Sequence, residues 1–243
     1  MFYSKLIITF LNFLDYFQQK KIIKLINSKF SKPIIIFDIG AHYGETIKLF
    51  LKKMNLEKIY SFEASPKNFQ ILKNNIPKNQ SSKIRIYNFG IGDRIGKNYI
   101  NQTIESSSST INQINKQSKY LKKKLKILNI KNEDSFYHKV PIKLLTLDSF
   151  IEENKIQYID LLKIDTEGYE FNVLKGLSKY SQKVKLVYFE HHYDDMIIKD
   201  YKFRNIHKLL KDYGFIMIKK SKMIFRKSFE YVYENQKNRN FDN

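Results

Sequence analysis

The sequence contains no cysteine among its 243 residues. Disulfide bonds and thiolate metal sites are therefore excluded, and no redox chemistry can rest on paired thiols. The absence fits a reducing compartment, so we expect a cytoplasmic protein. A chain of this length suits one α/β core with short extensions.

Arginine is scarce although the chain is strongly basic. The net charge is +20, yet only five of the 44 basic residues are arginines, and the lysines are spread along the whole chain. Arginine is the side chain that best recognises phosphates and bases through forked hydrogen bonds. The lysine excess therefore makes nucleic acid an unfavoured partner, and RNA is kept as an alternative because of the charge alone.

Long apolar runs are also missing. The N-terminal run over residues 6–14 contains Asn12 and is too short to span a bilayer, and no small-residue cleavage site follows it. Apolar residues between positions 2 and 17 recur at helical spacing, and lysines follow. We therefore predict an amphipathic helical extension over residues 1–32. Packing across the domain edge is the favoured interpretation, and peripheral membrane contact through residues 1–30 is the alternative.

The most informative segment that is present covers residues 34–46. A run of strand-forming residues ends at Asp38, and the chain then turns through Gly40 and Gly44 into a helical pattern. A strand, a glycine turn and a helix are how α/β proteins hold nucleotide-like cofactors. The spacing Asp-x-Gly-x-x-x-Gly differs from the Gly-x-Gly-x-x-Gly of dinucleotide sites, which disfavours a nicotinamide-dependent oxidoreductase. A carboxylate beside the turn suits a cationic ligand such as the amino-acid end of S-adenosylmethionine.

A second acid follows at a suitable distance. Glu63 ends the next predicted strand, 23 residues after Gly40. An acid about 20 residues beyond a glycine turn is placed to accept hydrogen bonds from ribose hydroxyls. The ordered pair of Asp38 and Glu63 is more telling than either residue alone, because each by itself fits an ordinary turn or a solvated strand end.

Strands and helices alternate through the rest of the chain, which predicts an α/β fold with a mostly parallel, doubly wound sheet, helices on both faces and an antiparallel edge. Residues 97–136 are a polar excursion that includes a serine tract at 106–109, which we expect to cover the ligand side as a polar loop. Two short apolar strands are expected at 215–218 and 223–225, and residues 229–243 are interpreted as a C-terminal tail.

Several predicted strands end in acids or histidines. Asp165 follows a buried strand at 158–164, and Glu190, His191 and His192 follow another at 184–189. The carboxyl ends of parallel strands meet at one edge of a sheet, so these side chains should converge with Asp38 and Glu63 on one crevice.

The chain resembles the FkbM family of S-adenosylmethionine-dependent methyltransferases. The matching segments are residues 37–44 (FDIGAHYG), 61–66 (SFEASP), 144–148 (LLTLD), 162–170 (LKIDTEGYE) and 173–176 (VLKG). The resemblance implies a Rossmann-like class I methyltransferase fold over residues 33–228 and methyl transfer, most often to a hydroxyl of a sugar, glycan or small metabolite, with an RNA methyltransferase as the alternative. The cofactor-binding residues that the resemblance implies are Asp38, Gly40, Ala41, Gly44, Glu63, Ala64 and Asp93, with Asp93 near the adenine.

Two features depart from the family pattern. His42 stands where asparagine is common, and the lysine-rich stretch near 115–135 is longer than in compact members, so substrate choice does not carry over.

Three residues are candidates for catalysis. Asp165 is best placed to orient the acceptor or draw its proton, and Glu167 either acts with it or caps the following helix. Of the two adjacent histidines only one should enter the crevice, because neighbouring residues on a strand point to opposite faces. His191 is favoured as a base because it directly follows the buried run. No metal is predicted; a divalent ion held by Asp165 with Glu190 or His191 is an alternative.

Overall fold

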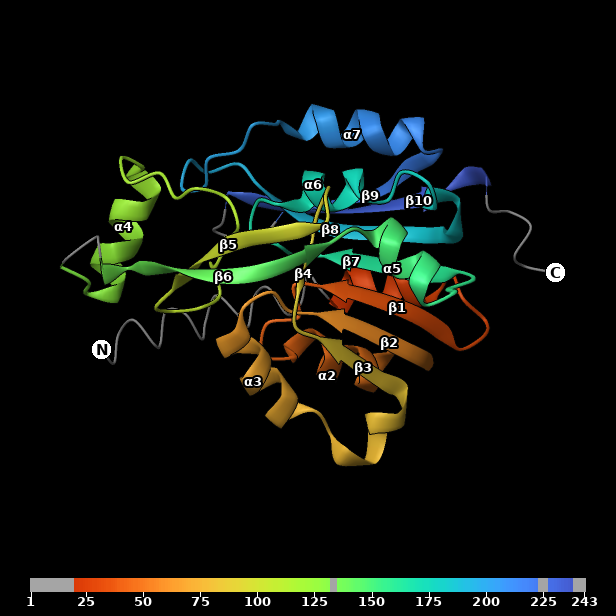
Figure 1. The fold of residues 1–243 in the computed structure, drawn as a ribbon. Helices are drawn as coiled ribbons and strands as arrows, with labels where there is room; N and C mark the ends of the chain where they lie inside the picture. The colour runs from red at the N-terminus through yellow and green to blue at the C-terminus, as the bar shows by residue number, and fades with distance from the viewer. Residues whose placement is uncertain (1–19, 132–134, 223–226, 238–243) are drawn as a thin grey trace.

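The computed structural model describes residues 20–131, 135–222 and 227–237 (Figure 1). Within them, seven strands form one sheet in the order β3-β2-β1-β7-β8-β10-β9. These strands are β1 (Ile34–Ile39), β2 (Leu56–Phe62), β3 (Ile84–Tyr87), β7 (Ile159–Ile164), β8 (Val184–His192), β9 (Phe215–Lys222) and β10 (Ser228–Asn235). Strands β3, β2, β1, β7 and β8 pair in parallel, and β10 runs antiparallel to both β8 and β9.

The strand order reverses between β1 and β7. From β1 the chain passes outward to β2 and β3, and it then returns to place β7 on the other side of β1. Loops that leave the carboxyl ends of β1 and β7 therefore diverge, and the space between them is where doubly wound sheets bind ligands.

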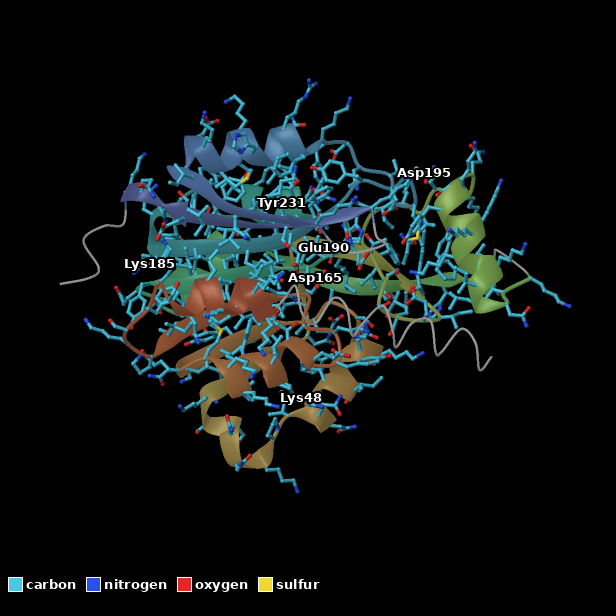
Figure 2. The ribbon with its side chains drawn as sticks, turned by 180° about the vertical axis from the view of Figure 1, so that it is seen from behind. Lys48, Asp165, Lys185, Glu190, Asp195 and Tyr231 are labelled. Atoms are coloured by element: carbon cyan, nitrogen blue, oxygen red, sulfur yellow. The ribbon has the colours of Figure 1, made fainter. Side chains whose placement is uncertain are left out.

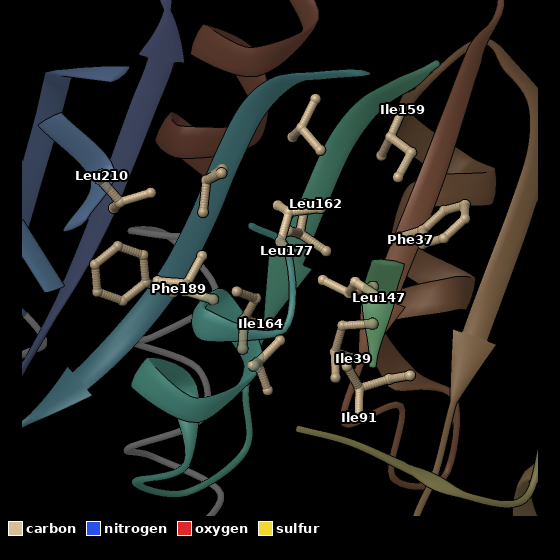
Figure 3. Packing of buried hydrophobic residues seen from close by; sticks show 14 of the residues in the cluster. Phe37, Ile39, Ile91, Leu147, Ile159, Leu162, Ile164, Leu177, Phe189 and Leu210 are labelled. Atoms are coloured by element: carbon tan, nitrogen blue, oxygen red, sulfur yellow. The ribbon is translucent and has the colours of Figure 1, made fainter. Parts of the chain in front are cut away.

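Helices cover both faces of the large sheet. Residues 20–27 form a helix that packs on one face with α2 (Glu45–Lys53) and α3 (Pro66–Asn75). The other face carries α5 (Leu147–Glu153), α6 (Glu170–Lys175) and α7 (Phe203–Asp212). Strand alternation explains the division: Ile36 joins the first core and Phe37 joins the second. Figure 3 shows the second core, where side chains from β1, β7, β8 and α7 meet.

The polar excursion folds into a small sheet of its own. Strand β6 (Tyr137–Leu145) pairs with β5 (Gly96–Thr103) and with β4 (Gly90–Ile91). Helix α4 (Lys119–Leu128) lies between β5 and β6 in the sequence. Figure 1 shows β5 and β6 running away from the large sheet toward α4. Two short 3₁₀ helices, at Lys78–Lys83 and Ser181–Lys183, complete the described elements.

The predicted C-terminal tail is wrong for residues 229–235. This segment is most of β10, which pairs on both sides and buries Tyr231 and Tyr233 completely. Its alternation of aromatic and polar residues is a strand pattern that the charges of Glu230 and Glu234 concealed. The antiparallel strand thus lies one position inside the edge, and β9 is the edge strand. The strand expected at 223–225 lies outside the described residues.

The N-terminal extension packs on the domain where it is described. Ile22 and Ile26 are fully buried against the core that contains α2. This agrees with the favoured interpretation for residues 20–27, whereas residues 1–19 of the predicted extension lie outside the described part. No helix within the described residues is long and apolar enough to cross a membrane.

Candidate active site

A cavity of about 400 Å³ opens at the carboxyl ends of β1, β2 and β7. Its walls come from the loops after these strands, from the end of β8 and from the serine tract of the excursion. Figure 2 shows Asp165 and Glu190, two of its acids, close to one another. The predicted site residues that line the cavity are Gly40, Ala41, Glu63, Ala64, Asp165 and Glu167. The sequence motifs therefore do converge on one space of a size typical of ligand sites.

Gly40 is required by the packing of the protein's own backbone. Its φ angle is +85°, and a Cβ built on it would lie 1.9 Å from the carbonyl oxygen of Asp165. Gly40 therefore lets the backbone directly after β1 pass close to the backbone directly after β7, before the two loops diverge. Gly44 has a φ angle of +89° and precedes α2, but it does not line the cavity.

Asp38 lies beneath the cavity and is paired with a lysine. It is fully buried, and its Oδ1 lies 3.1 Å from Nζ of Lys163, its neighbour in register on β7. The same Nζ lies 3.4 Å from Oδ2 of Asp165. Burial lowers the pKa of Lys163, but the charges of Asp38 and Asp165 outweigh it and raise that pKa above its usual value. Asp38 does not itself line the cavity, but its charge holds the ammonium group of Lys163, which does.

Lys163 was not among the residues predicted for the site. It lines the cavity with only 5 % of its surface exposed. The sequence signal was Lys163 between Leu162 and Ile164, which pack in an apolar core, since a lysine is almost never fully buried without a partner.

Glu63 is held by the backbone. Its Oε2 accepts a hydrogen bond from the amide of His42, and its Oε1 accepts one from the amide of Ser65, both at 2.8 Å. Burial raises the pKa of Glu63 to about 7, although these two hydrogen bonds oppose the change. The carboxylate is thus fixed in the cavity wall.

Asp93 is not brought to the cavity. Its Oδ2 accepts hydrogen bonds from Nζ of Lys175 at 2.7 Å and from Nδ2 of Asn172 at 3.1 Å. Burial raises the pKa of Asp93, but the bond and charge of Lys175 outweigh it, and the net pKa lies below its usual value. Because α6 occupies this carboxylate, the predicted contact with an adenine is not supported.

The two histidines at the end of β8 point to opposite faces, and the expected choice between them is wrong. His191 lies among the rings of Tyr193, Tyr201 and Phe203 and does not line the cavity. His192 lies 3.6 Å from both Glu167 and Glu190, which do line it. Strand β8 continues through His192, and its alternation places His191 on the same face as Phe189, which is the core side.

Glu167 does not cap a helix. Helix α6 begins at Glu170, and its N-cap residue is Tyr169. Glu167 adopts a φ angle of +51°, which is uncommon for a residue with a side chain, and its carbonyl accepts a 2.7 Å hydrogen bond from the hydroxyl of Thr110. The excursion therefore holds the loop that presents this carboxylate.

The serine tract is packed against the loop after β1. Oγ of Ser106 lies 2.8 Å from Nε2 of His42 and donates to the hydroxyl of Tyr43 at 2.8 Å. Ser107, Ser109 and Thr110 also line the cavity. The excursion therefore forms part of the cavity wall.

The cavity suits a cationic ligand. Its ionisable lining is mostly acidic, with Glu45, Glu63, Asp165, Glu167 and Glu190 against the paired Lys163. A ligand that carries a sulfonium and an ammonium group complements such a wall. For the divalent-ion alternative, no three acidic or histidine side chains in the described ranges are arranged to hold a metal.

The fold and the site together define a class of protein. The parallel sheet with antiparallel β10 between β8 and β9, and an acid-lined cavity where strand order reverses, are those of Rossmann-like class I methyltransferases. A methyltransferase FkbM structure from Methylobacillus flagellatus KT is similar in fold, with a TM-score of 0.52 and 17 % identity over 84 % of this chain and 44 % of that one. A TrmK structure from M. capricolum in complex with S-adenosylhomocysteine has a TM-score of 0.50 and 10 % identity over 88 % of this chain and 67 % of that one.

The family follows from the sequence. The family model described as "Methyltransferase FkbM domain" matches residues 38–217, and the chain belongs to this family.

Two curated relatives are each 24 % identical. One is a hexuronic acid methyltransferase, AglP, of Haloferax volcanii, matched over 72 % of this chain and 62 % of its own length. The other is methyltransferase 1 of Beauveria bassiana, matched over 61 % and 60 %. The chain therefore spans about three fifths of the length of these relatives.

Proposed function

We propose that this protein transfers the methyl group of S-adenosylmethionine to a hydroxyl of a sugar, glycan or small metabolite. The observation that carries the proposal is the convergence of Asp165, Glu167 and Glu190 in the cavity, opposite the backbone-held Glu63. Carboxylates orient a hydroxyl and can take its proton, which methyl transfer to oxygen requires. The name of the Haloferax volcanii relative supports a sugar acceptor.

The chain's residues divide the work in this proposal. Glu63 binds the ribose hydroxyls of the cofactor, and the turn at Gly40 and Ala41 faces its amino-acid end. Bound S-adenosylmethionine supplies an electrophilic methyl group. Asp165, held by Lys163, orients the acceptor hydroxyl toward that methyl group, and the serine tract offers further hydroxyls to a polar acceptor.

RNA is the second candidate acceptor, motivated by the net charge of +20. The acidic lining argues against it, because a phosphate near Asp165 and Glu190 would be repelled. Binding of RNA across a salt series separates the two candidates, since phosphate recognition weakens steeply with salt.

The direct test is methyl transfer from methyl-labelled S-adenosylmethionine to matched acceptors. We would offer a neutral methyl glycoside, the corresponding methyl glycosiduronic acid and an RNA transcript. Label in a sugar, located by mass spectrometry at a hydroxyl, is the expected result. Label in the RNA alone would overturn the choice of acceptor, and no bound cofactor would overturn the proposed activity.

A further inference from the structure

His192 is enclosed by carboxylates. Its Nε2 lies 3.6 Å from Oε2 of Glu167 and 3.6 Å from Oε1 of Glu190, and its Nδ1 lies 3.5 Å from Oδ2 of Asp194. All four side chains are at least four-fifths buried. These distances are within ion-pair range but longer than hydrogen bonds, as is common for catalytic groups in an enzyme without its substrates.

In the described part of the chain, the other cations act on these acids from further away. Nζ of Lys199 donates a hydrogen bond to the backbone carbonyl of His192, and its charge also acts on Glu167 and Asp194. Asp165 adds a further negative charge near Glu167, and Lys124 of α4 acts on Glu167 from a distance while it is paired with Glu105 at 2.7 Å. Among the described residues, the imidazole of His192 is therefore the cation closest to Glu167 and Glu190.

A comparison with His191, the preceding residue on β8, shows how the carboxylates change the pKa of His192. His191 differs by one position and lies among aromatic rings, where burial lowers the pKa of its imidazole to about 3. Burial also acts on His192, but the charges of Glu190, Glu167 and Asp194 outweigh it and raise its pKa to about 10. The strand alternation thus places a neutral imidazole on one face and a cationic one on the other.

We propose that His192 is a positioning residue, a cationic imidazolium that holds Glu167 ionised at the acceptor side of the cavity so that Glu167 receives the acceptor's proton. The proton step rests on the proposed function. In that step an acceptor oxygen forms a bond to the methyl carbon, the carbon–sulfur bond breaks with its electron pair going to sulfur, and the hydroxyl proton passes to the Glu167 carboxylate.

Glu167 suits this step better than Asp165. Burial first, and the charges of Asp165 and Glu190 with it, raise the pKa of Glu167 to about 7, while His192 opposes the rise. A base is most effective when its pKa lies near the working pH. Asp165 lies 3.4 Å from the cation of Lys163, which makes it the better orienting group.

The test needs no acceptor. Full-length protein labelled with ¹³C at glutamate carboxyls would be titrated by NMR, and the resonances of Glu167 and Glu63 would be assigned from E167Q and E63Q. Both should titrate near pH 7 in the unaltered protein. In H192Q the midpoint of Glu167 should rise by about one pH unit or more, whereas the midpoint of Glu63, at the opposite wall, should not move.

Three further variants separate charge from packing. H192K keeps a cation and should return the midpoint of Glu167 toward its original value. H191Q also removes a buried imidazole but lies on the other face, and it should leave the midpoint unchanged. E190Q removes a like charge and should lower the midpoint, and it serves as the charge test if H192Q does not fold.

A Glu167 midpoint that stays in place in H192Q, or in E190Q where only that variant folds, overturns the proposal. So does a shift of equal size in H191Q. Because the titration is made without an acceptor, neither result bears on whether the protein methylates sugars.

Discussion

The two sides of the cavity hold their acids in different ways. On the β2 side, Glu63 is fixed by two backbone amides that the turns after β1 and β2 supply. On the β7 and β8 side, Asp165, Glu167 and Glu190 are held by two buried cations, Lys163 and His192. Backbone amides carry no net charge and do not titrate, whereas the two cations bring side-chain charge to the acids that they hold. We therefore expect the first side to keep the cofactor and the second side to carry the variable chemistry.

The largest expected effect comes from breaking the buried pair between β1 and β7. Lys163→Met leaves the Asp38 carboxylate buried without its cation and should lower the free energy of unfolding by about 3 to 5 kcal/mol. Urea denaturation measures the loss. Lys179→Met, which removes the exposed pair with Glu152, is the matched control and should leave the unfolding midpoint unchanged. Equal midpoints in both variants would show that the buried pair contributes nothing special.

The second effect concerns turnover. Asp165→Asn keeps the shape of the side chain but removes the charge that orients the acceptor, so kcat should fall by a factor on the order of 10². The measurement is the initial rate of methyl transfer at saturating cofactor. Near-full activity in this variant would assign the orienting role to another group.

The third effect is a pH dependence of stability. Burial raises the pKa of Glu63 from 4.5 to about 7, so folding favours the protonated form of this side chain. Its contribution to the free energy of unfolding is therefore fully present below pH 4.5 and is lost as the pH rises to about 7. From pH 5 to pH 8, the free energy of unfolding should therefore fall by about 1 to 3 kcal/mol less in Glu63→Gln than in the unaltered protein. Denaturation curves at both pH values test this, and parallel losses in the two proteins would contradict it.

The smallest effect is expected at Asp93. Since Lys175 and Asn172 already occupy its carboxylate, Asp93→Ala should change the Kd for S-adenosylmethionine by less than about twofold, within the range of a group that touches no ligand. Titration calorimetry decides the point. A loss of tenfold or more would restore the adenine contact that the motif implied.

The sequence was sufficient for the parts of the fold that depend on local pattern. The glycine turn after Asp38, the acid at Glu63 and the alternating strands and helices each predict a structure from a few adjacent residues, and the parallel sheet with its crevice is confirmed. The family resemblance includes these segments, adds those at 144–148 and 162–176, and implies the same fold.

What could not be predicted depends on partners far apart in the sequence. The family resemblance assigned Asp93 to the cofactor, and nothing near it in the sequence indicated that Lys175, on α6, holds its carboxylate. His191 was preferred to His192 because the end of a buried strand is uncertain by one residue, and one residue reverses the face. The charged residues of β10 led to the prediction of a polar tail, although Glu230 is almost fully buried and β10 lies between β8 and β9.

The central claim is that the two sides of one cavity serve the cofactor and the acceptor separately. Titration calorimetry of S-adenosylmethionine into the unaltered protein, Glu63→Gln and Asp165→Asn tests it most directly. We predict one binding site per chain, an affinity at least about tenfold weaker in Glu63→Gln, where charge-assisted hydrogen bonds to the ribose are lost, and an affinity within a few-fold of the original in Asp165→Asn. Equal affinities in all three proteins, or equal losses in both variants, would contradict the account.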